Sequence, residues 1–145
     1  EYYRLLQAVR DCGVDNAKEW EEWILFILKG VEETSIETTA MIKAISKMMA
    51  DYKAVLKPLF GTTYKHELLN NLFFHPYTKI EFVCHDMGVQ RKTGAKYLDM
   101  IVAAGLLNKI KIGRENYYIN ERLFELFLNY SESVNTEDAD IIRTE

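Results

Sequence analysis

The sequence predicts a mainly α-helical protein, in which a helical N-terminal segment precedes a winged helix-turn-helix domain. Three observations carry this prediction. Apolar residues recur at spacings of three and four along most of the chain, as they do in amphipathic helices. Gly88 separates two such stretches where a tight turn is needed. After Gly105, apolar and polar residues alternate, which indicates a β-hairpin wing that closes a three-helix core.

Three parts are expected along the 145 residues. Residues 1–60 form a helical segment that includes a linking helix, and residues 61–128 form the winged helix-turn-helix domain. Residues 129–145 are acidic and without periodicity, so we expect a disordered tail there.

The N-terminal part is predicted to contain three helices. The first covers residues 2–10, and the second covers about 17–32 after a capping-box pattern that begins at Asn16. The same pattern at Thr34 begins the third helix, which should end near Pro58 because proline disfavours helical geometry in the preceding residue. This helix carries a heptad stripe of Met41, Ile45, Met48, Tyr52, Val55 and Leu59. We expect the stripe to pack on the preceding helices, with a dimer interface as the alternative.

The winged helix-turn-helix part begins with a helix over residues 65–74, and the turn-forming residues 75–78 follow it. Ile80 then begins a short helix that ends at the glycine turn. A longer helix starts at about Gln90 and stops at Gly105, which is a natural C-cap residue. Its buried face is predicted to contain Ala95, Leu98, Ile101 and Val102.

The wing is expected to consist of two strands, over residues 106–112 and 117–119, around the turn sequence GREN. Alternation along the first strand places Lys109 and Lys111 on the same face. After the wing, Asn120 can cap a last helix whose apolar positions are Leu123, Phe124, Phe127 and Leu128.

Charge is unevenly distributed along a chain whose formal net charge is −4. Between Val89 and Arg114, six basic side chains accompany a single acidic one, Asp99. A local basic patch of this kind fits a surface that binds phosphate groups. The candidate nucleic-acid-binding residues lie on the second helix of the helix-turn-helix and on the wing: Gln90, Arg91, Lys92, Thr93, Lys96, Tyr97, Lys109, Lys111 and Arg114.

These residues have two interpretations. If the domain binds DNA, Gln90 and Thr93 bond phosphates or base edges, while Arg91 and Lys92 supply charge or a guanine contact. The basic residues of the wing then hold the adjacent phosphate backbone. In the alternative, the same side chains are the solvated surface of a winged helix that binds protein, because a fold does not by itself fix a function.

Signals for catalysis and for metal binding are weak. Cys84, His85 and Asp86 combine a nucleophile, a base and a carboxylate, but neighbours on a helix point about 100° apart and are not expected to form a relay. No spacing of histidines or cysteines suits a metal ion, and no glycine-rich phosphate loop occurs. The sequence has no apolar run of membrane-spanning length, and its two cysteines suit reduced thiols. We therefore expect a cytoplasmic protein without a membrane partner.

Two blocks carry recognisable patterns of hydrophobic and small residues. The first is YYRLLQAVRDC followed by KEWEEWILFILKGVEET, within residues 2–34, and the second covers residues 66–119. The clearest parts of the second block are TGAKYL at residues 93–98 and AGLL at residues 104–107. Together the blocks resemble the C-terminal part of Fic (filamentation induced by cAMP) family proteins, with the winged helix that is appended to many bacterial members.

The resemblance implies a parent enzyme that transfers AMP from ATP to hydroxyl side chains of target proteins through an HxFxxGNGR-type loop. That loop is absent, because His75-Pro76-Tyr77 begins in a similar way but continues as TKIEF. We therefore expect no catalytic residue, metal ion or cofactor in this chain, with ATP and Mg²⁺ needed only at the missing active site. The expected function is a DNA-binding regulatory module. The alternative is a module that recognises the AMPylation target, a partner subunit or a second copy of the chain.

Overall fold

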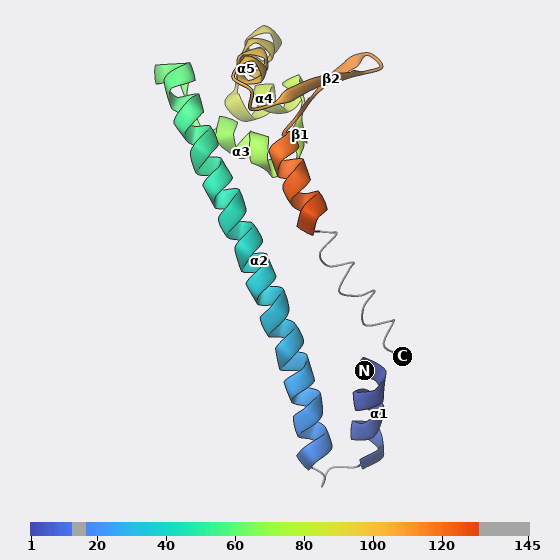
Figure 1. The fold of residues 1–145 in the computed structure, drawn as a ribbon. Helices are drawn as coiled ribbons and strands as arrows, with labels where there is room; N and C mark the ends of the chain where they lie inside the picture. Colours follow the sequence, from blue (N-terminus) through green and yellow to red (C-terminus); the bar gives the residue numbers. More distant parts are fainter. Residues whose placement is uncertain (13–16, 131–145) are drawn as a thin grey trace. The chain divides into compact units, whose positions relative to one another are not determined.

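The computed structural model describes residues 1–12 and 17–130 (Figure 1). Its elements, in order, are α1 (Tyr2–Cys12), α2 (Ala17–Phe60), a 3₁₀ turn (Gly61–Thr63), α3 (His66–Phe74), β1 (Tyr77–Thr78), α4 (Ile80–Met87), α5 (Arg91–Ala103), β2 (Asn108–Ile112) and β3 (Glu115–Ile119). Residues 121–130 form a final helix. The predicted class, mainly helical with a winged helix-turn-helix, is confirmed. None of the described helices is both long enough and apolar enough to cross a membrane.

The chain divides into two compact units, one ending at Lys43 and the other beginning at Ala44. The first unit contains α1 and the N-terminal part of α2. Leu5 and Val9 on α1 are buried, and the Tyr2 ring lies 5.2 Å from the Trp23 ring, centroid to centroid. The apolar spacing of α1 therefore marks its packed face, as the sequence predicts. The expected capping residue Asn16 lies outside the described residues.

The expected helix boundary at Thr34 is wrong, because α2 is continuous from Ala17 to Phe60. The Thr34 hydroxyl donates to the Gly30 carbonyl oxygen at 2.8 Å, and the Ser35 hydroxyl donates to the Val31 carbonyl oxygen at 2.6 Å. A hydroxyl that bonds back to the fourth preceding carbonyl is compatible with a helix interior, so the threonine does not act as a cap. Pro58 is accommodated in the last turn, and the helix ends two residues later than it.

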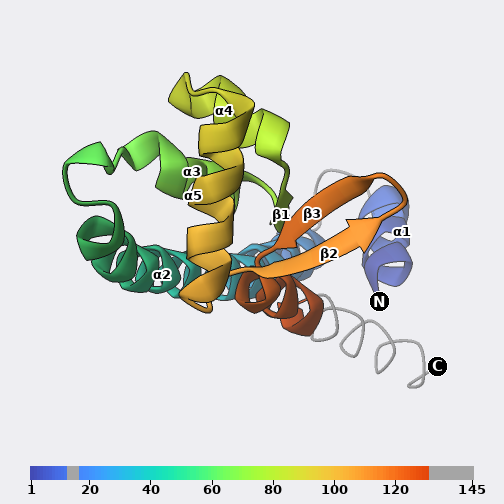
Figure 2. The ribbon, with the colours of Figure 1, turned by 90° about the horizontal axis from the view of Figure 1, so that it is seen from above.

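The second unit has its core between the C-terminal part of α2 and the helices that follow (Figure 2). The buried residues of α2 are Met48, Tyr52, Leu56 and Phe60, which recur every fourth residue. The centre of the Tyr52 ring lies 5.0 Å from the centre of the Phe73 ring of α3. From Ile45 onward the predicted stripe therefore packs on the following helices, where the preceding helices were expected, and Leu56 replaces the expected Val55, which is 38% exposed. Because Met48 and Tyr52 are enclosed within this unit, they are not available to a dimer interface.

A buried polar cluster joins four segments of the second unit. The Tyr52 hydroxyl lies 2.7 Å from Asn120 Oδ1 and 2.8 Å from the Leu106 carbonyl oxygen, and shares its single proton between these acceptors. The Asn120 amide nitrogen donates to the Leu72 carbonyl oxygen at 3.2 Å. Asn120 Oδ1 also accepts from the Leu123 backbone N–H at 3.2 Å, so the predicted cap of the last helix is confirmed. That helix continues to residue 130, two residues beyond the expected end, and the rest of the expected tail lies outside the described residues.

The helix-turn-helix follows the prediction closely. Gly88 adopts a left-handed conformation with φ 64° between α4 and α5, and Gly105 does so with φ 73° after α5. The Leu106 N–H donates to the Ile101 carbonyl oxygen at 3.2 Å, and the Gly105 N–H donates to the Val102 carbonyl oxygen at 2.9 Å. These two bonds form the Schellman motif that ends a helix. Both glycines therefore sit where residues with a Cβ atom would be strained.

The sheet is larger than expected, because three strands pair antiparallel in the order β1-β3-β2. Tyr77 and Thr78 were expected in a turn, but they pair with Ile119 and Tyr118 of β3. The hairpin turn is also tighter than expected. Ile112 pairs with Glu115, so only two residues connect the strands, with Gly113 at φ 61°. β3 is paired along both of its edges, and the local sequence does not specify its distant partner β1. This explains why the third strand was not expected.

Two fragments that begin at different points of the chain test how much α2 contributes to the core of the second unit. A fragment of residues 44–145 should unfold cooperatively, whereas a fragment of residues 61–145 should lack a stable fold because it loses the buried residues Met48, Tyr52, Leu56 and Phe60. Replacing one buried leucine by alanine already costs about 2–5 kcal/mol. Circular dichroism during urea titration measures both fragments. Equal cooperativity in the two would show that α2 is not part of this core.

The close approach of α4 and α5 gives a second test at Gly94. A Cβ atom added at Gly94 would lie 2.7 Å from Cys84 Sγ, closer than van der Waals contact permits. We expect Gly94→Ala to destabilise the protein by roughly 1–3 kcal/mol through overpacking, even though alanine in a helix interior is favoured over glycine by about 1 kcal/mol. In a Cys84→Ala background the same substitution should be neutral or stabilising. Urea unfolding of the four proteins measures this coupling, and additive effects would contradict it.

Candidate nucleic-acid interface

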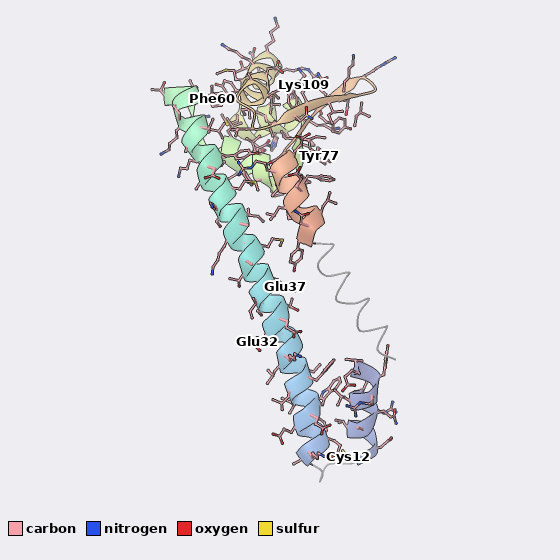
Figure 3. The ribbon with its side chains drawn as sticks, viewed as in Figure 1. Cys12, Glu32, Glu37, Phe60, Tyr77 and Lys109 are labelled. Atoms are coloured by element: carbon pink, nitrogen blue, oxygen red, sulfur yellow. The ribbon has the colours of Figure 1, made fainter. Side chains whose placement is uncertain are left out.

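The candidate residues lie on α5 and on the β2–β3 hairpin, which projects beyond α3, α4 and α5 (Figures 1 and 2). Leu98 and Ile101 are fully buried and hold one face of α5 against the core. The opposite face is therefore directed to solvent. On the hairpin, Tyr118 faces inward and is fully buried, whereas Tyr117 remains partly exposed. Figure 3 labels Lys109 on this hairpin.

The N-terminal end of α5 presents polar groups that are not used for capping. Gln90 is the N-cap residue, yet its side chain makes no capping hydrogen bond. Its carbonyl oxygen accepts from the Thr93 N–H at 2.9 Å and from the Gly94 N–H at 3.0 Å. The Gln90 amide is thus exposed at the start of the helix, where it can bond a phosphate or a base edge. Thr93 is half-buried beside it.

Two of the six cations are already paired with carboxylates. Arg91 Nη1 lies 3.4 Å from Glu81 Oε1, and Lys109 Nζ donates to Asp99 Oδ1 at 2.7 Å. The hydrogen bond to Asp99 raises the pKa of Lys109, whose ammonium also lies 5.4 Å from the centre of the Tyr118 ring. Exposed ion pairs of this kind contribute only about 0–1 kcal/mol, so an incoming phosphate can compete for either cation.

The other four cations form no ion pair with another residue among those that the structure describes. Lys92 and Lys96 lie one turn apart on α5 and border a shallow depression that also contains Asp99 and Met100. Lys111 is on β2, and Arg114 is in the hairpin turn. All four side chains are exposed. The structure therefore presents unpaired positive charge on the helix and on the wing together.

Tyr97 is placed differently from the other candidates. Its ring packs edge-on against Phe60 at the end of α2, with 5.0 Å between the ring centres, and it borders the hydrophobic core. The ring is therefore directed toward α2 and not toward the surface formed by the lysines. Figure 3 labels Phe60 at this end of the helix.

A charged cleft that the sequence did not suggest lies where the starts of α4 and α5 meet the hairpin. It is lined by Lys79, Glu81, Arg91, Arg114 and Glu115, among others. Lys79 Nζ lies 2.6 Å from Glu115 Oε2 and 4.5 Å from the centre of the Tyr117 ring. The hydrogen bond to Glu115 raises the pKa of Lys79, and the same bond lowers the pKa of Glu115. No local pattern could have revealed this pair, because its members are 36 positions apart.

Two neighbours on α4 are nevertheless in contact, although the three residues Cys84, His85 and Asp86 do not form a relay. His85 Nδ1 lies 3.0 Å from Asp86 Oδ1, because both side chains are exposed near the end of a short helix and can turn toward each other. Cys84 takes no part in this contact, since its sulfur faces Gly94 of α5. Within residues 1–12 and 17–130, no three histidine, cysteine or acidic side chains come close enough together to hold a metal ion.

Known proteins that are similar to this chain include a solved structure and a family of domains. A crystal structure of RV1404 from Mycobacterium tuberculosis aligns with 77% of this chain and 80% of its own at 17% identity, with a TM-score of 0.35 that is too low to bear on fold or function. The family described as "Protein adenylyltransferase SoFic-like, C-terminal domain" matches residues 48–123, just over half of the chain. The match begins in the part of α2 that enters the core and ends in the last helix, and it agrees with the resemblance to Fic proteins. The chain therefore belongs to the SoFic-like C-terminal domain family.

Proposed function

We propose that this chain is the winged-helix module of a Fic-type protein adenylyltransferase and that it binds DNA through α5 and the β2–β3 hairpin. The observation that carries the proposal is the joint exposure of Lys92, Lys96, Lys111 and Arg114 on these two elements, without carboxylate partners among the described residues. AMP transfer, with its ATP and Mg²⁺, belongs in this proposal to an active site outside the matched domain, because the chain lacks the HxFxxGNGR loop. The module acts in the cytoplasm, where nucleic acid is accessible.

The roles of the residues follow from the usual docking of a helix-turn-helix. The second helix enters the major groove with its N-terminal residues nearest the base edges, so Gln90 and Arg91 are the base-reading candidates. Lys92 and Lys96 then lie close to phosphates beside the groove. The hairpin places Lys111 and Arg114 against the adjacent backbone, where they position the domain without reading sequence.

Three carboxylates lie among these cations and limit the affinity. Glu81 and Asp99 each hold one cation of the proposed surface, and Glu115 lies beside Arg114 in the charged cleft. Each of them repels phosphate unless its cation lies between the two. Non-specific binding should consequently be weak and strongly dependent on salt, and tight binding should require base contacts that offset the repulsion.

Fluorescence anisotropy of a labelled random-sequence duplex tests the proposal. Four phosphate contacts should weaken binding roughly a hundredfold between about 50 and 200 mM salt. The double variant Lys92→Glu/Lys111→Glu should reduce the salt slope by about 2 and bind much more weakly. Lys47→Glu/Lys53→Glu is the matched control, because it reverses the same number of charges at two exposed lysines of α2, far along the sequence from the interface. Absence of binding by the unmodified chain at about 50 mM salt would favour the competing hypothesis of a protein-recognition module.

Neutralising the carboxylates should strengthen binding to the duplex, which is the opposite of the effect expected from reversing the lysines. Glu81→Gln releases Arg91, and Asp99→Asn releases Lys109, so each variant should bind the same duplex a few-fold more tightly at about 50 mM salt, in line with the ~0–1 kcal/mol of an exposed pair. The gain should shrink at about 200 mM salt because screening weakens both attractions. Unchanged affinity in both variants would mean that Arg91 and Lys109 do not approach the duplex.

A further inference from the structure

A second pocket, separate from the basic surface, lies between the C-terminal end of α3, β1 and α4. From its chemistry we infer that it binds an arginine side chain of a partner protein, independently of whether the domain binds DNA. Its lining includes Phe74, Tyr77, Phe82, His75, His85 and Asp86. Among the residues that the structure describes, no lysine or arginine lines it. Tyr77, which Figure 3 labels, marks its position on β1.

Exposed aromatic rings form the walls of this pocket. Phe74 is 79% exposed, and Tyr77 and Phe82 are 40% and 38% exposed. His75 connects the first two, because its ring lies 4.7 Å from the Phe74 ring and stacks on the Tyr77 ring at 6.0 Å with 17° between their planes. Three large aromatic side chains gathered around one hollow and left uncovered are typical of a protein-binding surface.

A buried chain of hydrogen bonds orients the carboxylate of the pocket. The Thr78 hydroxyl donates to Asn71 Oδ1 at 2.6 Å, and the Asn71 amide donates to Asp86 Oδ2 at 2.6 Å. Both Thr78 and Asn71 are buried. The bonds from His85 and Asn71 lower the pKa of Asp86, so the group is ionised at neutral pH. The carboxylate is therefore fixed in position and charged.

The carboxylate of the pocket has hydrogen-bond acceptor positions that remain available. A carboxylate has about four lone-pair positions, and the described partners of Asp86 use two of them. A ligand with several donors and a positive charge fits this arrangement. An anion would be repelled, and a purely apolar side chain would leave the acceptors without partners.

The volume of the pocket and its aromatic walls favour the arginine side chain of a protein over a free cofactor. The hollow has a volume of about 260 Å³, below the roughly 300–1,000 Å³ of clefts that hold small-molecule ligands. A guanidinium group stacks on aromatic faces and donates two parallel bonds to a carboxylate, which an ammonium group does less well. Arginine and aromatic residues are also enriched at the centres of protein interfaces. The exposed Phe74 ring would then contact the partner around the arginine.

Two-dimensional NMR of the full 145-residue chain tests the inference with a pair of matched peptides. The probe is a capped Gly-Arg-Gly peptide, and the control carries citrulline, which keeps the shape of arginine but not its charge. We expect shifts of the Phe74, Tyr77 and Phe82 ring signals and of the Asp86 amide with the arginine peptide. Binding of the citrulline peptide should be weaker by about tenfold, as for the loss of charge-assisted hydrogen bonds.

Variants separate the pocket from general charge attraction. Asp86→Asn removes the charge but keeps a carbonyl acceptor for Asn71, and it should weaken binding about tenfold. Asp99→Asn removes the same charge from α5 and should leave arginine binding unchanged. If Asp86→Asn fails to fold, Phe74→Ala serves instead, because its ring is 79% exposed and should be dispensable for stability. Equal binding of the two peptides, or shifts that map to α5 and the hairpin, would overturn the inference.

Discussion

The hydroxyl of Tyr52 is the point on which the winged-helix unit depends. It bonds with Asn120 and with the Leu106 carbonyl oxygen, and the Asn120 amide reaches the Leu72 carbonyl oxygen. The C-terminal part of α2, α3, the segment after α5 and the start of the last helix thus meet at one buried cluster. Because burial disfavours the ionised phenol, it raises the pKa of Tyr52 and keeps the group neutral. Polar groups buried in this way must find partners, so the cluster admits few alternative arrangements of the four segments.

That constraint positions the candidate interface. The segment after α5 leads directly into β2, so the carbonyl oxygen held by Tyr52 fixes where the hairpin begins. At the other end of α5, the missing side chain of Gly94 allows the helix to approach Cys84 on α4. The backbone that carries the cations of α5 and the hairpin is consequently held in place at both ends of α5. Glu81 and Asp99 each pair with one of these cations, Arg91 and Lys109, and so reduce the local positive charge.

The two surfaces of the unit differ in chemistry. The proposed DNA surface consists of cations on α5 and the hairpin, while the pocket formed by α3, β1 and α4 combines aromatic rings with Asp86. Tyr77 and Tyr117 lie with their ring centres 5.8 Å apart on neighbouring strands, so the same sheet supports both surfaces. In the two proposals together, DNA bound on one surface and a basic partner segment bound on the other would bring a Fic-type enzyme and that partner to the same DNA site.

The sequence by itself determined the helices of the helix-turn-helix, the presence of a hairpin after them and the left-handed glycines at residues 88 and 105, because periodicity and turn chemistry are local properties. It also indicated the cap at Asn120 and the basic stretch on α5 and the wing. Only the tertiary structure decided that α2 continues through Thr34, that its buried face joins the following helices and that Tyr97 packs against Phe60. It likewise decided which cations are paired, as in Lys79 with Glu115. These outcomes depend on which surfaces and charges meet across long separations, and no local pattern specifies such meetings.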